Sequence, residues 1–200
     1  MQASFTTATA TKRASFALSV IASCAIALGV GAPTASAGGG CPNADLVPAG
    51  PQDVPAVEAA TRCLINVQRR RHGLRSLKFN ADLQKSSDWQ AQDMIDHAYF
   101  DHSRPGGPGF AGRITRFGYA ASANGYMLGE NIAWATSDAA SPREMVSMWM
   151  HSPPHRQNIL RRGFKDQAIS AVYSAGGVGG DYADSNGPFV VYVNQFGTRY

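Results

Sequence analysis

The 200-residue chain has the length of one domain plus a removable segment. Its 18 basic and 14 acidic residues give a formal charge of +4, which falls to +2 without residues 1–37 because Lys12 and Arg13 leave with that segment. The run Arg69-Arg70-Arg71 is interpreted as a solvated helix end, where cations suit the helix dipole. We therefore expect no nucleic-acid partner.

Residues 1–37 read as a secretory signal peptide. Lys12 and Arg13 form a positive start, an apolar stretch covers 14–30, and Ala35-Ser36-Ala37 offers the small-residue pattern of a cleavage site. A membrane anchor is the alternative, but the apolar run is short for a span and ends in a small-residue site. No later segment reaches the ~20 apolar residues of a membrane helix, so we expect a secreted, extracellular protein without a transmembrane segment.

Two cysteines, Cys41 and Cys63, remain after residue 37, and Cys24 leaves with the signal peptide. Two thiols in an exported chain predict one disulfide bond. This bond would tie an N-terminal arm, residues 38–54, to the helix that follows it. A catalytic cysteine is the alternative, and an oxidising compartment argues against it.

Helices are predicted in the first part of the chain after the arm. Apolar residues at three- and four-residue spacing predict a first helix from Pro55 to the three arginines. Asn80 is a good N-cap for a second helix, and a short third helix is expected to end at Gly118. The segment 141–144, Ser-Pro-Arg-Glu, has the serine, proline and glutamate of a capped helix start, and Pro153 is expected to stop that helix.

Strands are predicted in the second half of the chain. Residues 130–135 read as a short strand or as an extended entry to a helix, and residues 168–173 and 189–196 are rich in β-branched and aromatic residues. Helices come first and strands last, with no repeated βαβ pattern. This order predicts an α+β fold in which helices cover an antiparallel sheet.

The common catalytic motifs are absent from this sequence. His151 and His155 have the spacing of a zinc-protease pair, but prolines lie between them and Ser152 stands where that motif needs a glutamate. The sequence also has no Gly-x-Ser-x-Gly element for a serine nucleophile.

Several short phrases are more specific when they are taken together. In chain order they are Gly73-Leu74-Arg75-Ser76-Leu77, Phe100-Asp101-His102-Ser103, Arg113-Ile114, Gly129-Glu130-Asn131-Ile132-Ala133, Ser152-Pro153-Pro154-His155-Arg156-Gln157-Asn158-Ile159-Leu160 and Gln195-Phe196-Gly197. In this order the chain resembles the bacterial, SCP-like branch of the CAP superfamily of cysteine-rich secretory, antigen 5 and pathogenesis-related proteins. The resemblance assigns a CAP domain to residues 55–200.

The resemblance implies a three-layer α-β-α sandwich with a central antiparallel sheet. It also implies a cleft lined by two histidines and two acidic residues. His102, Glu130 and His155 match three of these positions, and the second acid has no match. Asn131 is expected to orient the residues that line this cleft without lining it itself.

Two imidazoles and a carboxylate can bind a divalent cation such as zinc, with His102, His155 and Glu130 as ligands, or can act as an acid–base set. Alternatively, Glu130 accepts hydrogen bonds from both imidazoles in a buried network that joins the helices to the sheet. We expect an open cleft, in which Glu130→Gln would change stability by no more than about 1 kcal/mol.

Two functions from different classes follow from the resemblance. The favoured one is a monomeric, secreted binding module for a lipid, sterol or cell-surface ligand. The alternative is a metal-assisted hydrolase acting on extracellular peptide or cell-wall material, and a scaffold without a ligand is a third possibility. Catalysis is less favoured because the sequence shows no nucleophile or oxyanion site.

Overall fold

A computed structural model describes residues 40–185 and 187–200, so the predicted signal peptide lies outside the described residues. No helix within these ranges is long and apolar enough to cross a membrane. The α-helices are α1 (Val54–Arg71), α2 (Ala81–Asp96), α3 (Phe110–Arg116), α4 (Pro142–His151) and α5 (Pro153–Ile159). The strands are β1 (Lys78–Phe79), β2 (Tyr126–Thr136), β3 (Asp166–Ser174) and β4 (Phe189–Arg199). Short 3-10 helices lie at Pro51–Asp53, Ser137–Ala140 and Gly180–Tyr182.

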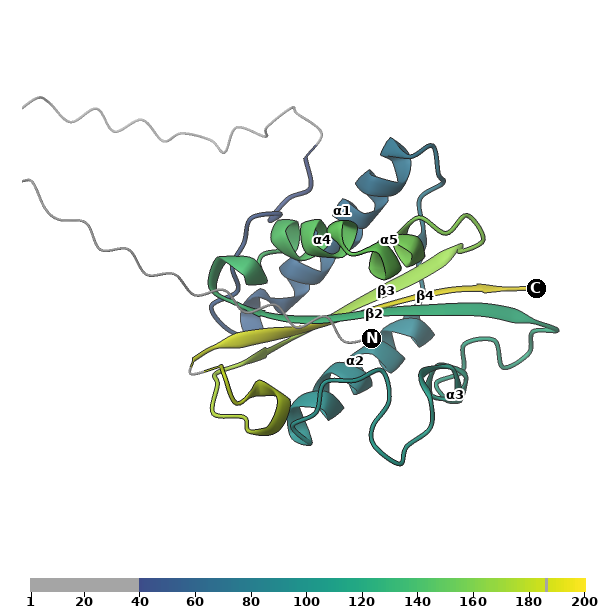
Figure 1. The fold of residues 1–200 in the computed structure, drawn as a ribbon. Helices are drawn as coiled ribbons and strands as arrows, with labels where there is room; N and C mark the ends of the chain where they lie inside the picture. The colour runs from purple at the N-terminus through teal and green to yellow at the C-terminus, as the bar shows by residue number, and fades with distance from the viewer. Residues whose placement is uncertain (1–39, 186) are drawn as a thin grey trace, which may run out of the picture. The chain divides into compact units, whose positions relative to one another are not determined.

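The four strands form one sheet in the order β1-β3-β4-β2. β4 pairs antiparallel with β2 on one side and with β3 on the other, whereas the two-residue β1 pairs parallel with β3. α1, α4 and α5 cover one face of the sheet, and α2 and α3 cover the other (Figure 1). This arrangement confirms the predicted α+β sandwich, and the short parallel edge strand is its one departure from an antiparallel sheet.

The central strand β4 supplies both halves of the hydrophobic core. Its alternating side chains point to opposite faces of the sheet. Val190 and Tyr192 therefore join the cluster that contains Trp149 of α4. Val191 and Val193 join the cluster that contains Met94 of α2, on the other face. The buried centre of the sheet thus holds β2 rigidly beside β4, and β2 carries the central residue of the candidate site.

Most of the predicted helix boundaries are confirmed. The side chain of Asn80 accepts hydrogen bonds from the backbone at Asp82 and Leu83, and Ser141 accepts one from the backbone of Glu144. The predicted stop before Pro153 is confirmed, since α4 ends at His151. The expectation that only β structure follows is wrong. A second helix, α5, begins at that proline, because proline lacks only an N–H that the first turn of a helix leaves unbonded.

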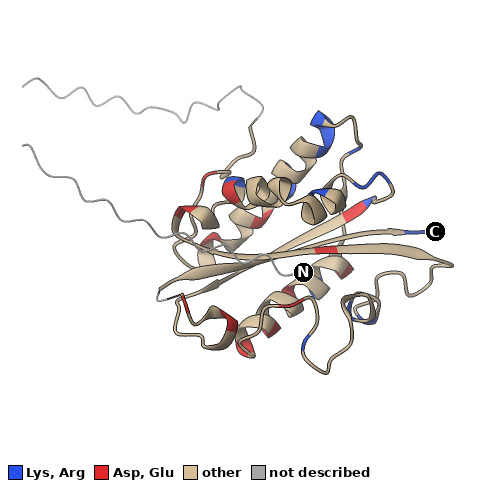
Figure 2. Cartoon of the chain, viewed as in Figure 1, with Lys and Arg blue, Asp and Glu red and all other residues tan. Residues whose placement is uncertain are grey.

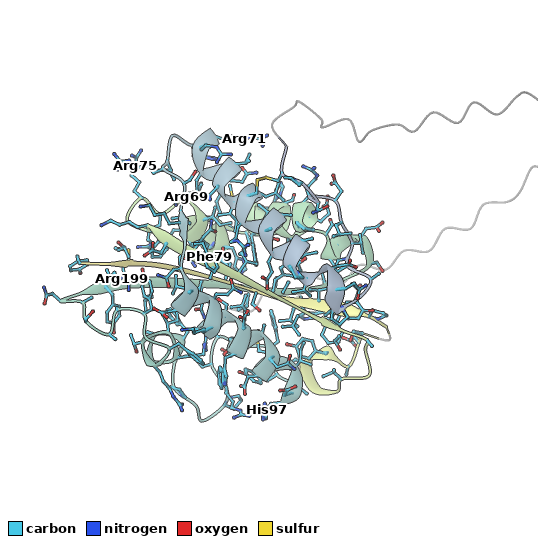
Figure 3. The ribbon with its side chains drawn as sticks, turned by 180° about the vertical axis from the view of Figure 1, so that it is seen from behind. Arg69, Arg71, Arg75, Phe79, His97 and Arg199 are labelled. Atoms are coloured by element: carbon cyan, nitrogen blue, oxygen red, sulfur yellow. A yellow bond between two sulfur atoms is a disulfide. The ribbon has the colours of Figure 1, made fainter. Side chains whose placement is uncertain are left out.

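The prediction that the whole arginine run is solvated is wrong for its first member. Arg69 is buried, and its guanidinium donates to the backbone carbonyls of Arg75, Ile159 and Arg161 at 2.7–3.1 Å. These bonds join the end of α1 to the loop after α5, whereas Arg71 and Arg75 point outward (Figure 3). Lysines and arginines gather at this end of α1, as Figure 2 shows.

The predicted disulfide joins Cys41 to Cys63 of α1, with 5.7 Å between their Cα atoms. The arm is also held to α4, since the backbone N–H of Arg143 donates to the carbonyl of Ala44 at 2.8 Å. The Arg143 guanidinium pairs with the exposed carboxylate of Asp45, with Nη2 and Oδ2 2.9 Å apart. The described part of the arm, from residue 40, is therefore fixed to two helices.

The part of the β3 edge that β1 leaves unpaired is covered by a side chain of α1. β1 pairs only with Asp166 and Gln167, and Glu58 of α1 accepts a hydrogen bond from the backbone N–H of Ala171 at 3.1 Å. Burial raises the pKa of Glu58 to about 7, and the nearby charge of Asp88 acts in the same direction. The carboxyl therefore holds a proton in the folded state at a pH where the unfolded chain has lost it.

This raised pKa predicts that the free energy of unfolding falls as pH rises from about 4.5 to about 7, because the folded state binds the extra proton in that window. The contribution is at most about 3 kcal/mol, and partial solvent exposure reduces it. Urea unfolding of the wild type and of Glu58→Gln across this window measures it as the difference between their pH profiles. Identical profiles would contradict the assignment.

Candidate functional site

Glu130 is the centre of the candidate site. It lies in β2 directly opposite Gln195 of β4, and its side chain is 1% exposed. Gln195 Nε2 donates to Glu130 Oε2 at 2.9 Å, and Arg113 of α3 donates to the same oxygen in an ion pair whose arginine side chain is 3% exposed. The carboxylate is therefore a buried anchor for α3 and not a group open to solvent, which differs from the open cleft expected at Glu130.

The imidazole of His102 contacts the other oxygen of the Glu130 carboxylate. Its Nδ1 lies 2.9 Å from Glu130 Oε1, and its side chain is 45% exposed. A carboxylate only accepts hydrogen bonds, so Nδ1 carries a proton, and in the neutral ring Nε2 keeps its lone pair. Arg113 also donates to the backbone carbonyl of His102 at 2.9 Å. Glu130 and Arg113 thus fix the position and the tautomer of this imidazole.

His155 comes from the opposite side of the sheet edge, on α5. Its Nδ1 lies 2.8 Å from the hydroxyl oxygen of Ser152, and the residue is half-buried. Burial lowers the pKa of His155, and the charge of the nearby His102 lowers it further. His102 thus acts on His155 through its charge, although the two residues are 53 positions apart in the sequence. His155 therefore stays neutral to lower pH than an ordinary histidine.

Two asparagines join α5 to β2 beneath the histidines. Asn158 Nδ2 donates to the carbonyl of Glu130 at 3.2 Å and to Oδ1 of Asn131 at 2.9 Å. Asn131 Nδ2 in turn donates to the carbonyl of His155 at 3.1 Å. A side chain at Gly129 would not fit here, because a Cβ would lie 3.0 Å from Asn158 Oδ1 and 2.8 Å from the Phe164 ring. In the Gly-Glu-Asn phrase, Gly129 leaves room for the side chains of α5 and the loop after it. Glu130 binds Arg113, and Asn131 joins β2 to α5.

His151 does not belong to this group. It ends α4, its Nδ1 lies 2.8 Å from the carbonyl of Ser147, and it is exposed. His155 lies on α5, so the two histidines do not share one continuous helix. The rejection of a zinc-protease pair therefore agrees with the geometry.

Sequence reasoning assigned no role to four residues of the site, namely Arg113, Ser152, Asn158 and Gln195. Each of them lies inside one of the phrases that carried the resemblance. The phrases were therefore the available signal, but the contacts depend on strand register and on the docking of α3. Neither the pairing of Gln195 with Glu130 nor the approach of Arg113 follows from spacing along the chain.

The donor set for a metal ion consists of the two Nε2 atoms. Both oxygens of Glu130 are already bonded to His102, Arg113 and Gln195. Within residues 40–185 and 187–200, no group of three or more His, Cys, Asp or Glu side chains is arranged to hold a metal. This differs from the expected set of His102, His155 and Glu130. A cation could be held by the imidazoles alone, with Glu130 orienting one of them.

Comparison with known proteins agrees with the fold. The family model of the cysteine-rich secretory protein family, CAP, matches residues 63–195. The chain therefore belongs to the CAP family, in its bacterial branch. The uncharacterised protein YkwD of Bacillus subtilis is 35% identical over 124 residues. That match covers 62% of this chain and 46% of YkwD, so the chain matches less than half of this relative.

Solved structures share the fold at lower identity. An extracellular protein of Bacillus anthracis that contains an SCP domain aligns with a TM-score of 0.54 and 23% identity, over 75% of this chain and 44% of that one. A cysteine-rich secretory protein of Staphylococcus aureus gives 0.52 and 15%, over 72% and 39%. An outer surface protein of Borrelia burgdorferi gives 0.53 and 19%, over 70% and 90%.

Proposed function

We propose that this chain is an exported binding protein that uses the surface around His102 and His155 to hold a lipid, sterol or cell-surface ligand. One observation carries the proposal. Both imidazoles are fixed through Nδ1, by Glu130 and by Ser152, while neither ring is fully buried. Each ring is thereby held in a set orientation with Nε2 left for a partner from outside the chain.

Export is part of the proposal. It rests on the apolar, positively started segment 1–37 and on a disulfide, which persists in oxidising compartments. The secretory family description and the extracellular relative support it. We propose that residues 1–37 are removed and that the domain acts as a monomer outside the cell.

The test is binding of the mature protein to isolated cell envelopes, followed by sedimentation. The wild type is expected to sediment with the envelopes, and the His102→Ala, His155→Ala double variant to remain in the supernatant. His151→Ala is the matched control, because that histidine is exposed and lies outside the group. Equal sedimentation of wild type and double variant would contradict the proposed binding surface.

Zinc probes the same pair of imidazoles. Since only neutral imidazole ligates a metal, we expect weak zinc binding that declines as pH falls below ~6.5. Loss of either His102 or His155 should weaken it by at least about tenfold. Titration calorimetry of wild type, of both single variants and of His151→Ala measures this. Equal zinc affinity in wild type and in the double variant would rule out the pair as the zinc site.

A hydrolase that acts on extracellular peptide or cell-wall material is the second candidate. The observation that favours it is the 2.8 Å contact between the Ser152 hydroxyl and Nδ1 of His155, the separation expected of a nucleophile and its base. The lowered pKa of His155 keeps its imidazole able to accept a proton at neutral pH. Turnover of cell-wall fragments or peptides that is lost in Ser152→Ala would establish this role, and unchanged turnover would exclude Ser152 as the nucleophile.

A further inference from the structure

A pocket lies beside the histidine site, between α2, the loop 103–109 and α3. Its volume is about 710 Å³. Its walls are formed by Trp89 of α2, by prolines and glycines of the loop, and by Phe117 and arginines at α3. Pockets that bind small molecules span roughly 300–1,000 Å³. The pocket therefore has the volume of a small-ligand site.

One wall of this pocket is apolar and built from flat rings. Trp89 is 38% exposed, and its ring lies 6.2 Å from that of Phe117, tilted by 47°. Pro105 and Pro108 line the loop side. An exposed tryptophan ring gains free energy when another apolar surface covers it. The wall is suited to a flat ring or a similar apolar group.

The other wall is cationic. Arg104 pairs with Asp93 at 3.3 Å, and Arg113 pairs with Glu130. Arg116 is exposed, and among the described residues no carboxylate lies within 4.0 Å of its guanidinium. The wall thus carries one positive charge that is not compensated inside the described part of the chain.

Arg113, which lines the pocket, also has an unsatisfied donor. Arg113 is 2% exposed, and its Nε is buried without a hydrogen-bond partner, although its two terminal nitrogens are bonded to His102 and Glu130. Leaving a buried N–H of a charged group unpaired is unfavourable. The uncompensated charge of Arg116 therefore favours an anion in this pocket.

We propose that this pocket binds a small carboxylate that carries an aromatic or other flat cyclic group. The ring covers Trp89 and Phe117, and the carboxylate faces Arg116. A single uncompensated cation fits one anionic head better than a polyanion, whose many charges would need many cations. The pocket adjoins the proposed histidine surface at Arg113, which bonds to His102 and Glu130, but the proposal does not depend on that surface having a ligand.

The experiment is titration calorimetry with 4-biphenylcarboxylate, beside two comparison compounds. 4-Biphenylmethanol has the same rings without the charge, and acetate has the charge without the rings. The carboxylate is expected to bind the wild type, and both comparison compounds are expected to bind at least about tenfold more weakly. Equal binding of the alcohol would overturn anion recognition, and equal binding of acetate would overturn the role of the rings.

Variants place the binding in this pocket. Arg116→Gln and Trp89→Ala should each weaken 4-biphenylcarboxylate by about tenfold. Arg162→Gln is the matched control, because this exposed arginine lies outside the pocket, and it should leave the affinity unchanged. No binding to the wild type, or equal affinity in wild type and Arg116→Gln, overturns the proposal. Loss of binding in His155→Ala with Arg116→Gln unaffected would assign the compound to the histidine surface and also overturn it.

Discussion

Replacing Glu130 with glutamine is expected to lower the free energy of unfolding by about 3–5 kcal/mol. The change removes the charge that compensates Arg113, and both side chains are almost fully buried. It also turns one acceptor oxygen into a donor amide beside Gln195, which already donates to that carboxylate. This expectation replaces the change of no more than about 1 kcal/mol that an open cleft had implied.

Chemical denaturation of the two proteins in the presence of chelator measures this difference. Glu144→Gln is the control, because Glu144 is exposed at the start of α4 and its charge contributes only about 0.3–1 kcal/mol there. Adding Arg113→Met to Glu130→Gln should recover part of the loss, since the stranded charge is then gone. A loss below about 1 kcal/mol for Glu130→Gln would show that water reaches the carboxylate.

Removal of the disulfide has the next largest expected effect. The Cys41→Ser, Cys63→Ser double variant should lose about 3 kcal/mol, because the bond closes a loop with a sequence separation of 22 and restricts the unfolded chain. Reduced wild type should match the double variant in chemical denaturation.

Thiol labelling of the folded, unreduced protein provides an independent check on the bond. The mature wild type should show no reactive cysteine until it is reduced. Two labelled cysteines before reduction would contradict the disulfide, and a double variant as stable as the oxidised wild type would show that the Ala44 and Asp45 contacts with α4 hold the arm by themselves.

The helix starts could be predicted because their signals are local. Asn80 and Ser141 bond to backbone groups two or three residues away, so the sequence carries the whole interaction. The length of β2 could not be predicted in the same way. Its first residues pair with the end of β4, and that pairing depends on the register of the sheet. Strand β2 therefore begins at Tyr126, four residues before the start at residue 130 that its local pattern predicts.

The candidate site shows the same division between local and distant information. The resemblance grouped His102, Glu130 and His155, and of these His102 and Glu130 are in direct contact. Their hydrogen bonds could not be predicted from the phrases, because Glu130 bonds to Arg113, 17 positions before it, and to Gln195, 65 positions after it. In the alternative reading both imidazoles bond to Glu130; only His102 does so, since Nδ1 of His155 contacts Ser152 instead.

The central claim is that His102 and His155 belong to one site in which the charge of one acts on the other, and titration of His155 by NMR tests it most directly. In the wild type we expect a pKa below the ordinary histidine value, because burial and the charge of His102 both lower it. In His102→Gln the charge is gone and burial remains, so the pKa of His155 should rise part of the way, whereas His151→Gln should not change it. A His155 titration that is the same in wild type and His102→Gln would contradict the account.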